Sequence, residues 1–221
     1  MRTILPLLLA AMLGACTTVP VAPTAAHLLH DELFQPPSER IEGAAEIFAV
    51  SDDMRHHLVF ELATQLRLKG RAKGLSEALY SRNMLAIDYD GTLTRNAAET
   101  FRVRSGNCLS LAIMTAAMAR ALDLEVTYQS VIGEEQWSRS GGVYFASGHV
   151  NLTLGRRYID PKRALGEVLT IDFVPARAPH GQRTWPIEER TVAAMYMNNR
   201  AAEALALGRW SDAYWWARAA L

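Results

Sequence analysis

The sequence has no excess of charge of either sign. Its 221 residues include 23 Lys and Arg against 23 Asp and Glu, and no long run of one sign appears. Nucleic acids and anionic membrane surfaces attract proteins that carry a basic excess, so we expect no nucleic-acid partner. The acidic residues are scattered and form no Asp-x-Asp-x-Asp loop, so we expect no divalent metal site. We expect no cofactor either.

Cysteine is scarce, and the first of the two cysteines closes an N-terminal leader. Residues 1–15 have a short basic start at Arg2, an apolar run and two small residues just before Cys16. The apolar run is far shorter than the roughly 20 residues of a spanning helix, so this segment predicts a secretory signal peptide.

The end of the leader, Leu13-Gly14-Ala15-Cys16, resembles the lipobox of bacterial lipoproteins. The resemblance implies cleavage before Cys16 and attachment of acyl chains such as palmitate to that residue. Thr17, rather than Asp, follows the cysteine, which in bacteria with two membranes implies the outer membrane. We therefore expect a protein of the bacterial cell envelope, anchored by lipid on the periplasmic face of the outer membrane. Residues 16–40 would form the lipidated tether and linker.

The second cysteine, Cys108, then has no partner for a disulfide. An unpaired thiol outside the cytosol is open to oxidation, which favours either deep burial or use. Gly106 and Asn107 predict a turn, and residues 109–122 contain no Gly or Pro and are rich in helix formers. Cys108 should therefore lie at the first turn of a helix, where the dipole and unpaired N–H groups favour a thiolate and can hold an oxyanion.

The residues around this cysteine resemble the core of the transglutaminase-like superfamily. The matching positions are Thr100-Phe101-x-x-Arg104-x-Gly106-Asn107-Cys108-Leu109-Ser110-x-Ala112, followed by Ala119-x-Ala121-Leu122. The resemblance implies a papain-like α+β core, in which the helix bearing the cysteine packs on an antiparallel sheet and adjacent strands carry a histidine and an aspartate. We assign this domain to residues 41–180 and expect helices to precede the nucleophile.

The predicted histidine is His149. Residues 125–132 and 143–154 alternate as strands do, and His149 lies on the second of them, in the order that the family implies. An ordinary surface histidine is the alternative.

The connection between these two strands is predicted to be a polar loop at residues 133–142. Its Trp137 could line a substrate groove together with Asn107, or could cover the edge of the core.

Two aspartates compete for the third position of the triad. Asp172 ends the apolar segment 169–174, which is the better strand, whereas Pro161 cuts short the segment that carries Asp160. Asp172 would lie opposite His149 if Leu154 paired with Glu167, and Asp160 would do so through a tight turn after Leu154. We favour Asp172 and keep Asp160 as the alternative. A strand-end aspartate that binds loop amides is a further alternative.

The C-terminal part, residues 181–221, predicts two helices at 187–207 and 210–221. The run Ala201-Ala202-x-Ala204-Leu205-x-x-Gly208-x-Trp210-x-x-Ala213, followed by Ala219-Ala220-Leu221, resembles a single tetratricopeptide-type hairpin. One such hairpin cannot stack on neighbouring repeats. It should therefore pack on the catalytic domain through its aromatic residues or offer them to a protein partner.

These features predict an enzyme that hydrolyses or transamidates protein or peptide amides of the cell envelope through an acyl-thioester on Cys108. His149 would take the proton of the thiol, and the aspartate would orient the ring. The alternative function is a non-catalytic envelope scaffold that binds a partner through the helical hairpin.

Overall fold

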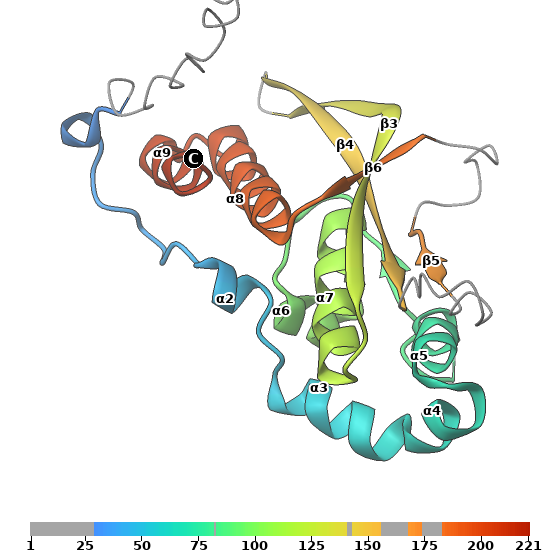
Figure 1. Ribbon diagram of the computed structural model, residues 1–221. Coiled ribbons are helices and arrows are strands. Elements are labelled where there is room, and N and C mark those ends of the chain that lie inside the picture. Colours follow the sequence, from blue (N-terminus) through green and yellow to red (C-terminus); the bar gives the residue numbers. More distant parts are fainter. Residues whose placement is uncertain (1–28, 82, 141–142, 156–167, 174–182) are drawn as a thin grey trace, which may run out of the picture. The chain divides into compact units, whose positions relative to one another are not determined.

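The computed structural model describes residues 29–81, 83–140, 143–155, 168–173 and 183–221 (Figure 1). Cys16 and Asp160 lie outside these residues. Contacts divide the chain into two units, Met1–Asp31 and Glu32–Leu221. In the described part of the chain, no helix combines the length and the apolar character that crossing a membrane requires.

The fold is a mixture of helices and an antiparallel sheet, which confirms the α+β prediction. The helices are η3 (Asp31–Leu33), α2 (Ala44–Ile47), α3 (Asp52–His56), η4 (His57–Glu61), α4 (Ala63–Lys69), α5 (Arg71–Tyr80), α6 (Ala97–Val103), α7 (Cys108–Ala121), α8 (Glu189–Ala206) and α9 (Trp210–Ala219). The strands are β1 (Asp88–Tyr89), β2 (Ser105–Gly106), β3 (Val126–Ser140), β4 (Val143–Leu154), β5 (Leu169–Ile171) and β6 (Thr184–Ile187).

The main sheet has the order β5-β4-β3-β6, and every neighbouring pair is antiparallel. The predicted loop at 133–142 is wrong as far as Ser140, because β3 continues through it and pairs with β4. The register shifts between Val131 and Gln136, so a bulge absorbs the irregular part of the segment. The backbone of this polar segment forms hydrogen bonds with β4. Local amino-acid composition does not predict a pairing with a distant strand.

Strand β6 was not predicted, because Pro186 interrupts its sequence. It pairs with β3 at the edge of the sheet, with Gln129 opposite Pro186. An edge strand tolerates proline, because the outward-facing backbone needs no N–H for a ladder bond.

Helix α7 is the centre of the core. Every residue from Leu109 to Ala119 is buried, so this helix is covered on all sides. It packs against β4, and Figure 1 shows it running along the sheet. A helix enclosed in this way cannot turn or slide without disturbing close packing, so its first residue has a fixed place.

The turn before α7 requires glycine at position 106. A Cβ on Gly106 would lie 2.8 Å from Cβ of Ser110 and 3.3 Å from Cγ2 of Thr100. This close approach lets β2 pair in parallel with β1, which places Tyr89 beside Gly106 and close to the start of α7.

The two C-terminal helices pack against each other and join the same core. Gly208, with φ of +73°, lies in the turn between them. Trp216 is buried against Tyr196, whereas Trp210 is 66% exposed. Phe34 stacks on Tyr214 of α9, with ring centroids 3.8 Å apart. The hairpin is therefore held both by the core and by the segment that precedes α2.

Candidate active site

Three side chains predicted from the sequence meet at one place. Nε2 of His149 lies 2.8 Å from Oδ1 of Asp172, and Cys108 is near enough to the His149 ring to help raise its pKa. The cysteine comes from the start of α7, the histidine from β4, and the aspartate directly follows β5. A thiol, an imidazole and a carboxylate, the groups that a cysteine nucleophile uses, are thus brought to one place.

Cys108 is the first residue of α7, as predicted, and its thiol is partly buried and free. Asn107 caps the helix, since its Oδ1 accepts a hydrogen bond of 2.9 Å from the Ser110 N–H. The positive end of the α7 dipole and the unpaired N–H groups of its first turn therefore lie beside the sulfur.

His149 is buried, with 4% of its surface exposed, so the surface alternative is wrong. Residues 149–154 are all at most 9% exposed, so both faces of this part of β4 are covered. Because Nε2 faces Asp172, Nδ1 is the ring nitrogen that the carboxylate leaves unused. The ring is therefore influenced both by the carboxylate of Asp172 and by Cys108.

The surroundings of His149 favour its protonated form. Burial by itself lowers the pKa of the imidazole, but the hydrogen bonds to Asp172 and Cys108 and their negative charges outweigh it. Together, these opposing contributions raise the pKa of His149 to about 9. At neutral pH the ring is therefore an imidazolium with a proton on each nitrogen.

Asp172 reaches His149 in a register that differs from the predicted one. Leu154 pairs with Leu169, not with Glu167, and Leu152 pairs with Ile171. This is a slip of two residues, and since side chains alternate with a period of two, Asp172 keeps the same face of the sheet as His149. It bonds to the ring diagonally instead of from directly opposite.

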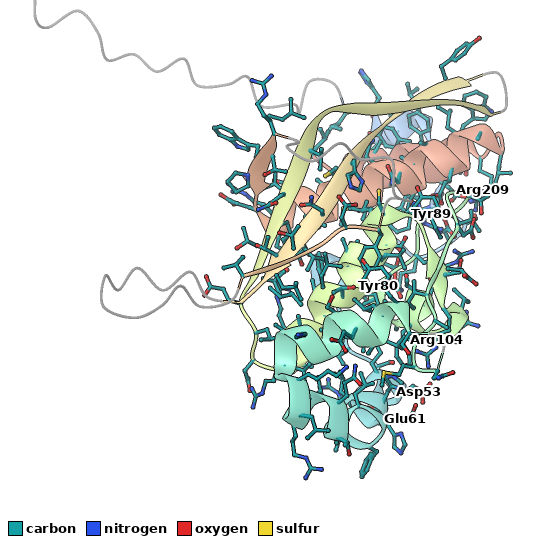
Figure 2. The ribbon with its side chains drawn as sticks, turned by 90° about the vertical axis from the view of Figure 1, so that its right-hand side faces the viewer. Asp53, Glu61, Tyr80, Tyr89, Arg104 and Arg209 are labelled. Carbon is teal, nitrogen blue, oxygen red and sulfur yellow. The ribbon has the colours of Figure 1, made fainter. Side chains whose placement is uncertain are left out.

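Two tyrosines that the sequence analysis missed lie beside the triad, and Figure 2 labels both. The Tyr80 hydroxyl donates a hydrogen bond of 2.9 Å to the backbone carbonyl of Asp172. Burial and the charge of Asp172 raise the pKa of Tyr80 to about 12, so this hydroxyl stays a neutral donor. Burial, together with the negative charges of Cys108 and Asp90, raises the pKa of Tyr89. Strand β1 has only two residues, so the sequence contains no periodic pattern from which the position of Tyr89 could have been predicted.

The other predicted site residues have different places. Both ends of the Asn107 amide bind protein groups, since Oδ1 accepts from Ser110 and Nδ2 donates to Thr94. This makes Asn107 a cap of α7. The backbone of Trp137 lies in β3, opposite Ala146, and its side chain lies outside the described residues, as does Asp160.

Elsewhere in the described part of the chain, a cavity of about 280 Å³ lies at α3 and η4, and it is lined in part by His57, Phe101 and Arg104. None of the triad residues lines it. Among the described residues, no group of three or more His, Cys, Asp or Glu side chains could hold a metal ion. The triad is therefore the place where the described residues concentrate reactive groups.

Comparisons with protein-family models, with curated protein sequences and with solved structures find no match for this chain.

The Asp172 carboxylate should account for most of the rise in the pKa of His149. We expect Asp172→Asn to lower the pKa of His149 well below 9, because burial then acts without the carboxylate. The change should appear in the ring carbon and nitrogen shifts of His149, followed by nuclear magnetic resonance across pH. Asp123→Asn is the matched control, since the Asp123 side chain is 87% exposed and bonds to Arg71. A pKa for His149 that stays near 9 in Asp172→Asn would contradict this account.

The same shift predicts how folding stability depends on pH. The folded-state pKa of about 9 lies above the ordinary value of 6.5. The stability that this protonated ring contributes is therefore fully present below pH 6.5 and is lost as pH rises through 9.

Proposed function

We propose that this chain is a cysteine-dependent acyl-transfer enzyme with a transglutaminase-like, papain-like core. The observation that carries the proposal is the buried ring of His149, which hydrogen-bonds to Asp172 and whose pKa is raised by both Asp172 and Cys108. A structural cysteine needs neither a helix N-terminus nor a paired imidazolium.

The arrangement of the elements supports the family assignment. Helix α7 begins with the nucleophile and packs on an antiparallel sheet, and the histidine and the aspartate come from β4 and from the end of its neighbour β5. The chain order of cysteine, histidine and aspartate is the order implied by the resemblance of residues 100–122.

In the first half of the reaction, the Cys108 thiolate attacks the carbonyl carbon of an amide and the C–S bond forms. The carbonyl oxygen becomes an oxyanion, for which the Cys108 backbone N–H at the first turn of α7 is a donor. When the tetrahedral intermediate collapses, the C–N bond breaks and His149 gives its proton to the leaving amine. An acyl-thioester on Cys108 and a neutral His149 remain.

In the second half, neutral His149 takes a proton from water or from an amine that attacks the thioester carbonyl. The C–S bond breaks, the acyl group leaves as an acid or as a new amide, and the imidazolium–thiolate pair is restored. Asp172 stays ionised and holds the ring in place. Water gives hydrolysis, and an amine gives transamidation.

The N-terminal leader sets where we propose that this chemistry takes place. Lipidation of Cys16 would tether the domain to a bacterial envelope membrane, so its substrates would be envelope proteins or peptides. Their amide bonds are the acyl donors that a cysteine nucleophile can attack.

A test is to capture the acyl-enzyme. The full chain in detergent, carrying Cys16→Ser so that Cys108 is its one cysteine, is mixed with p-nitrophenyl acetate. We expect a burst of p-nitrophenolate and an acetyl group on Cys108 by peptide mass spectrometry. Cys108→Ala should abolish both, and His149→Ala should slow the burst by about 100-fold.

His56→Ala serves as the control for this experiment, because the side chain of His56 is 64% exposed and lies on α3. Adding a primary amine separates hydrolysis from transamidation, since transamidation yields the acetamide of the amine. Acetylation of Cys108 at equal rates in the parent chain and in the His149→Ala variant would contradict the proposed mechanism.

The proposed anchor has its own test. In a bacterial host with a lipoprotein pathway, we expect labelled palmitate to appear on the chain and the chain to sediment with membranes. Cys16→Ser should lose both properties, and Cys108→Ser should keep them. Labelling that survives Cys16→Ser would refute the anchor at this residue.

A further inference from the structure

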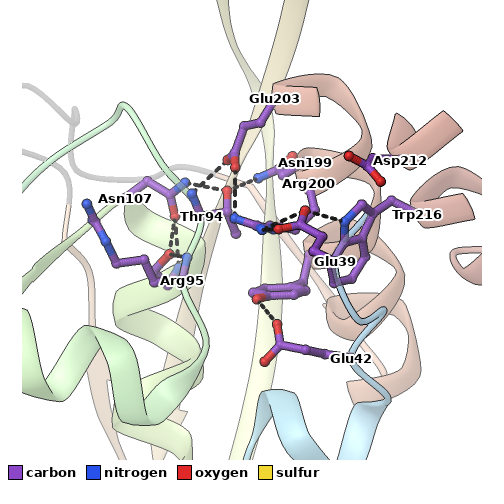
Figure 3. Close-up of polar contacts among 12 residues, drawn as sticks. Glu39, Glu42, Thr94, Arg95, Asn107, Asn199, Arg200, Glu203, Asp212 and Trp216 are labelled. Carbon is purple, nitrogen blue, oxygen red and sulfur yellow. Dashed lines mark hydrogen bonds and ion pairs between the residues drawn. The ribbon is translucent and has the colours of Figure 1, made fainter. Parts of the chain in front are cut away.

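A chain of partly buried hydrogen bonds joins helix α8 to the cap of α7, although the two helices are far apart in the sequence. Figure 3 shows this network, which runs from Glu203 and Asn199 on α8 through Thr94 to Asn107. Asn107 directly precedes Cys108, so the network ends one residue from the proposed nucleophile.

Both the oxygen and the nitrogen of the Asn107 side-chain amide form hydrogen bonds. Oδ1 accepts hydrogen bonds of 2.9 Å from the backbone N–H and from the hydroxyl of Ser110, and Nδ2 donates a bond of 2.9 Å to Oγ1 of Thr94. An amide that is bonded at both ends cannot flip without losing partners. The orientation of Asn107 therefore depends on where Thr94 lies.

Thr94 is 1% exposed and is held by α8 at two points. Its backbone N–H donates a hydrogen bond of 2.7 Å to Oε1 of Glu203. Its Oγ1 accepts from Nδ2 of Asn199 at 3.2 Å, besides accepting from Asn107. The loop that carries Thr94 therefore has its position set by α8.

Helix α8 is itself fixed by contacts that do not involve the triad. Arg200 pairs with both Glu203 and Glu39, and the Trp216 indole N–H donates to Glu39 at 3.0 Å. Tyr196 of α8 is buried and hydrogen-bonds to Glu42. A helix anchored in this way can serve as a reference point for the loop at Thr94.

We propose that α8 positions the nucleophile, with Thr94, Asn199 and Glu203 acting as positioning residues through Asn107. This inference rests on the proposed function of Cys108 and gives the C-terminal hairpin a part in it. The cap fixes the first turn of α7, and the first turn fixes the sulfur relative to His149.

The hydroxyl of Thr94 can be removed with little change in shape. Thr94→Val keeps the volume of the side chain but leaves Nδ2 of Asn107 and Nδ2 of Asn199 without their acceptor. Asn107 can then rotate, and the start of α7 loses its fixed cap. We expect Cys108 to react about tenfold more slowly with iodoacetamide at about pH 6 in this variant. Thr94→Ser keeps the hydroxyl and should restore the rate.

The experiment uses the full chain with Cys16→Ser in detergent, so that the alkylation rate reports on Cys108 alone. Asp212→Asn is the matched control on α9. Asp212 is 3% exposed and accepts hydrogen bonds from the backbone and hydroxyl of Ser38 and from Arg209. This control therefore replaces one oxygen of a buried carboxylate on the same hairpin by an NH2 group, and Asp212 makes no hydrogen bond to Thr94. Melting temperatures are measured for every variant.

The inference is supported if Thr94→Val slows alkylation while Thr94→Ser and Asp212→Asn do not, whatever their melting temperatures. It is overturned if Thr94→Val reacts at the parent rate, or if Asp212→Asn slows alkylation to the same extent. A different result in the same assay would contradict the proposed function, namely a His149→Ala variant in which Cys108 reacts at the parent rate.

Discussion

The candidate site depends on one polar contact, in which the buried ring of His149 bonds to Asp172 in the neighbourhood of Cys108. Burial works against a charged imidazole, so the ring keeps its proton only because hydrogen bonds and negative charge on both sides compensate. The same three groups are the ones that a thiolate nucleophile needs. The contact that stabilises the charge is thus also the contact that would carry the chemistry.

The rest of the fold holds this contact in place. Residues 109–119 of helix α7 are all buried, and Gly106 lets the chain enter the helix through a turn in which a Cβ would lie 2.8 Å from Cβ of Ser110. Strands β4 and β5 bring His149 and Asp172 to one face of the sheet. The C-terminal helices belong to the same core, and α8 reaches back to the cap of α7 through Thr94.

The sequence predicted the features that depend on local chemistry and on side-chain period. Cys108 lies at a helix start because Asn107 caps it and helix formers follow, and Asp172 stays on the face of His149 even though the register slips by two residues. It did not predict the full length of β3, nor β6. The role of Thr94 was not predicted either, because it depends on a hydrogen bond from Asn199 of α8, which is distant in the sequence. Non-local pairing of this kind leaves no periodic signal in a single sequence.

The central claim is that His149 activates Cys108. The most direct test is the rate at which iodoacetamide alkylates Cys108 at about pH 6, where few ordinary thiols are ionised. The full chain with Cys16→Ser is compared with the same chain carrying His149→Ala. The account predicts that the parent chain reacts at least about tenfold faster, because an imidazolium beside the sulfur favours the thiolate. Equal rates in the two chains would contradict it and would leave the triad as a structural cluster.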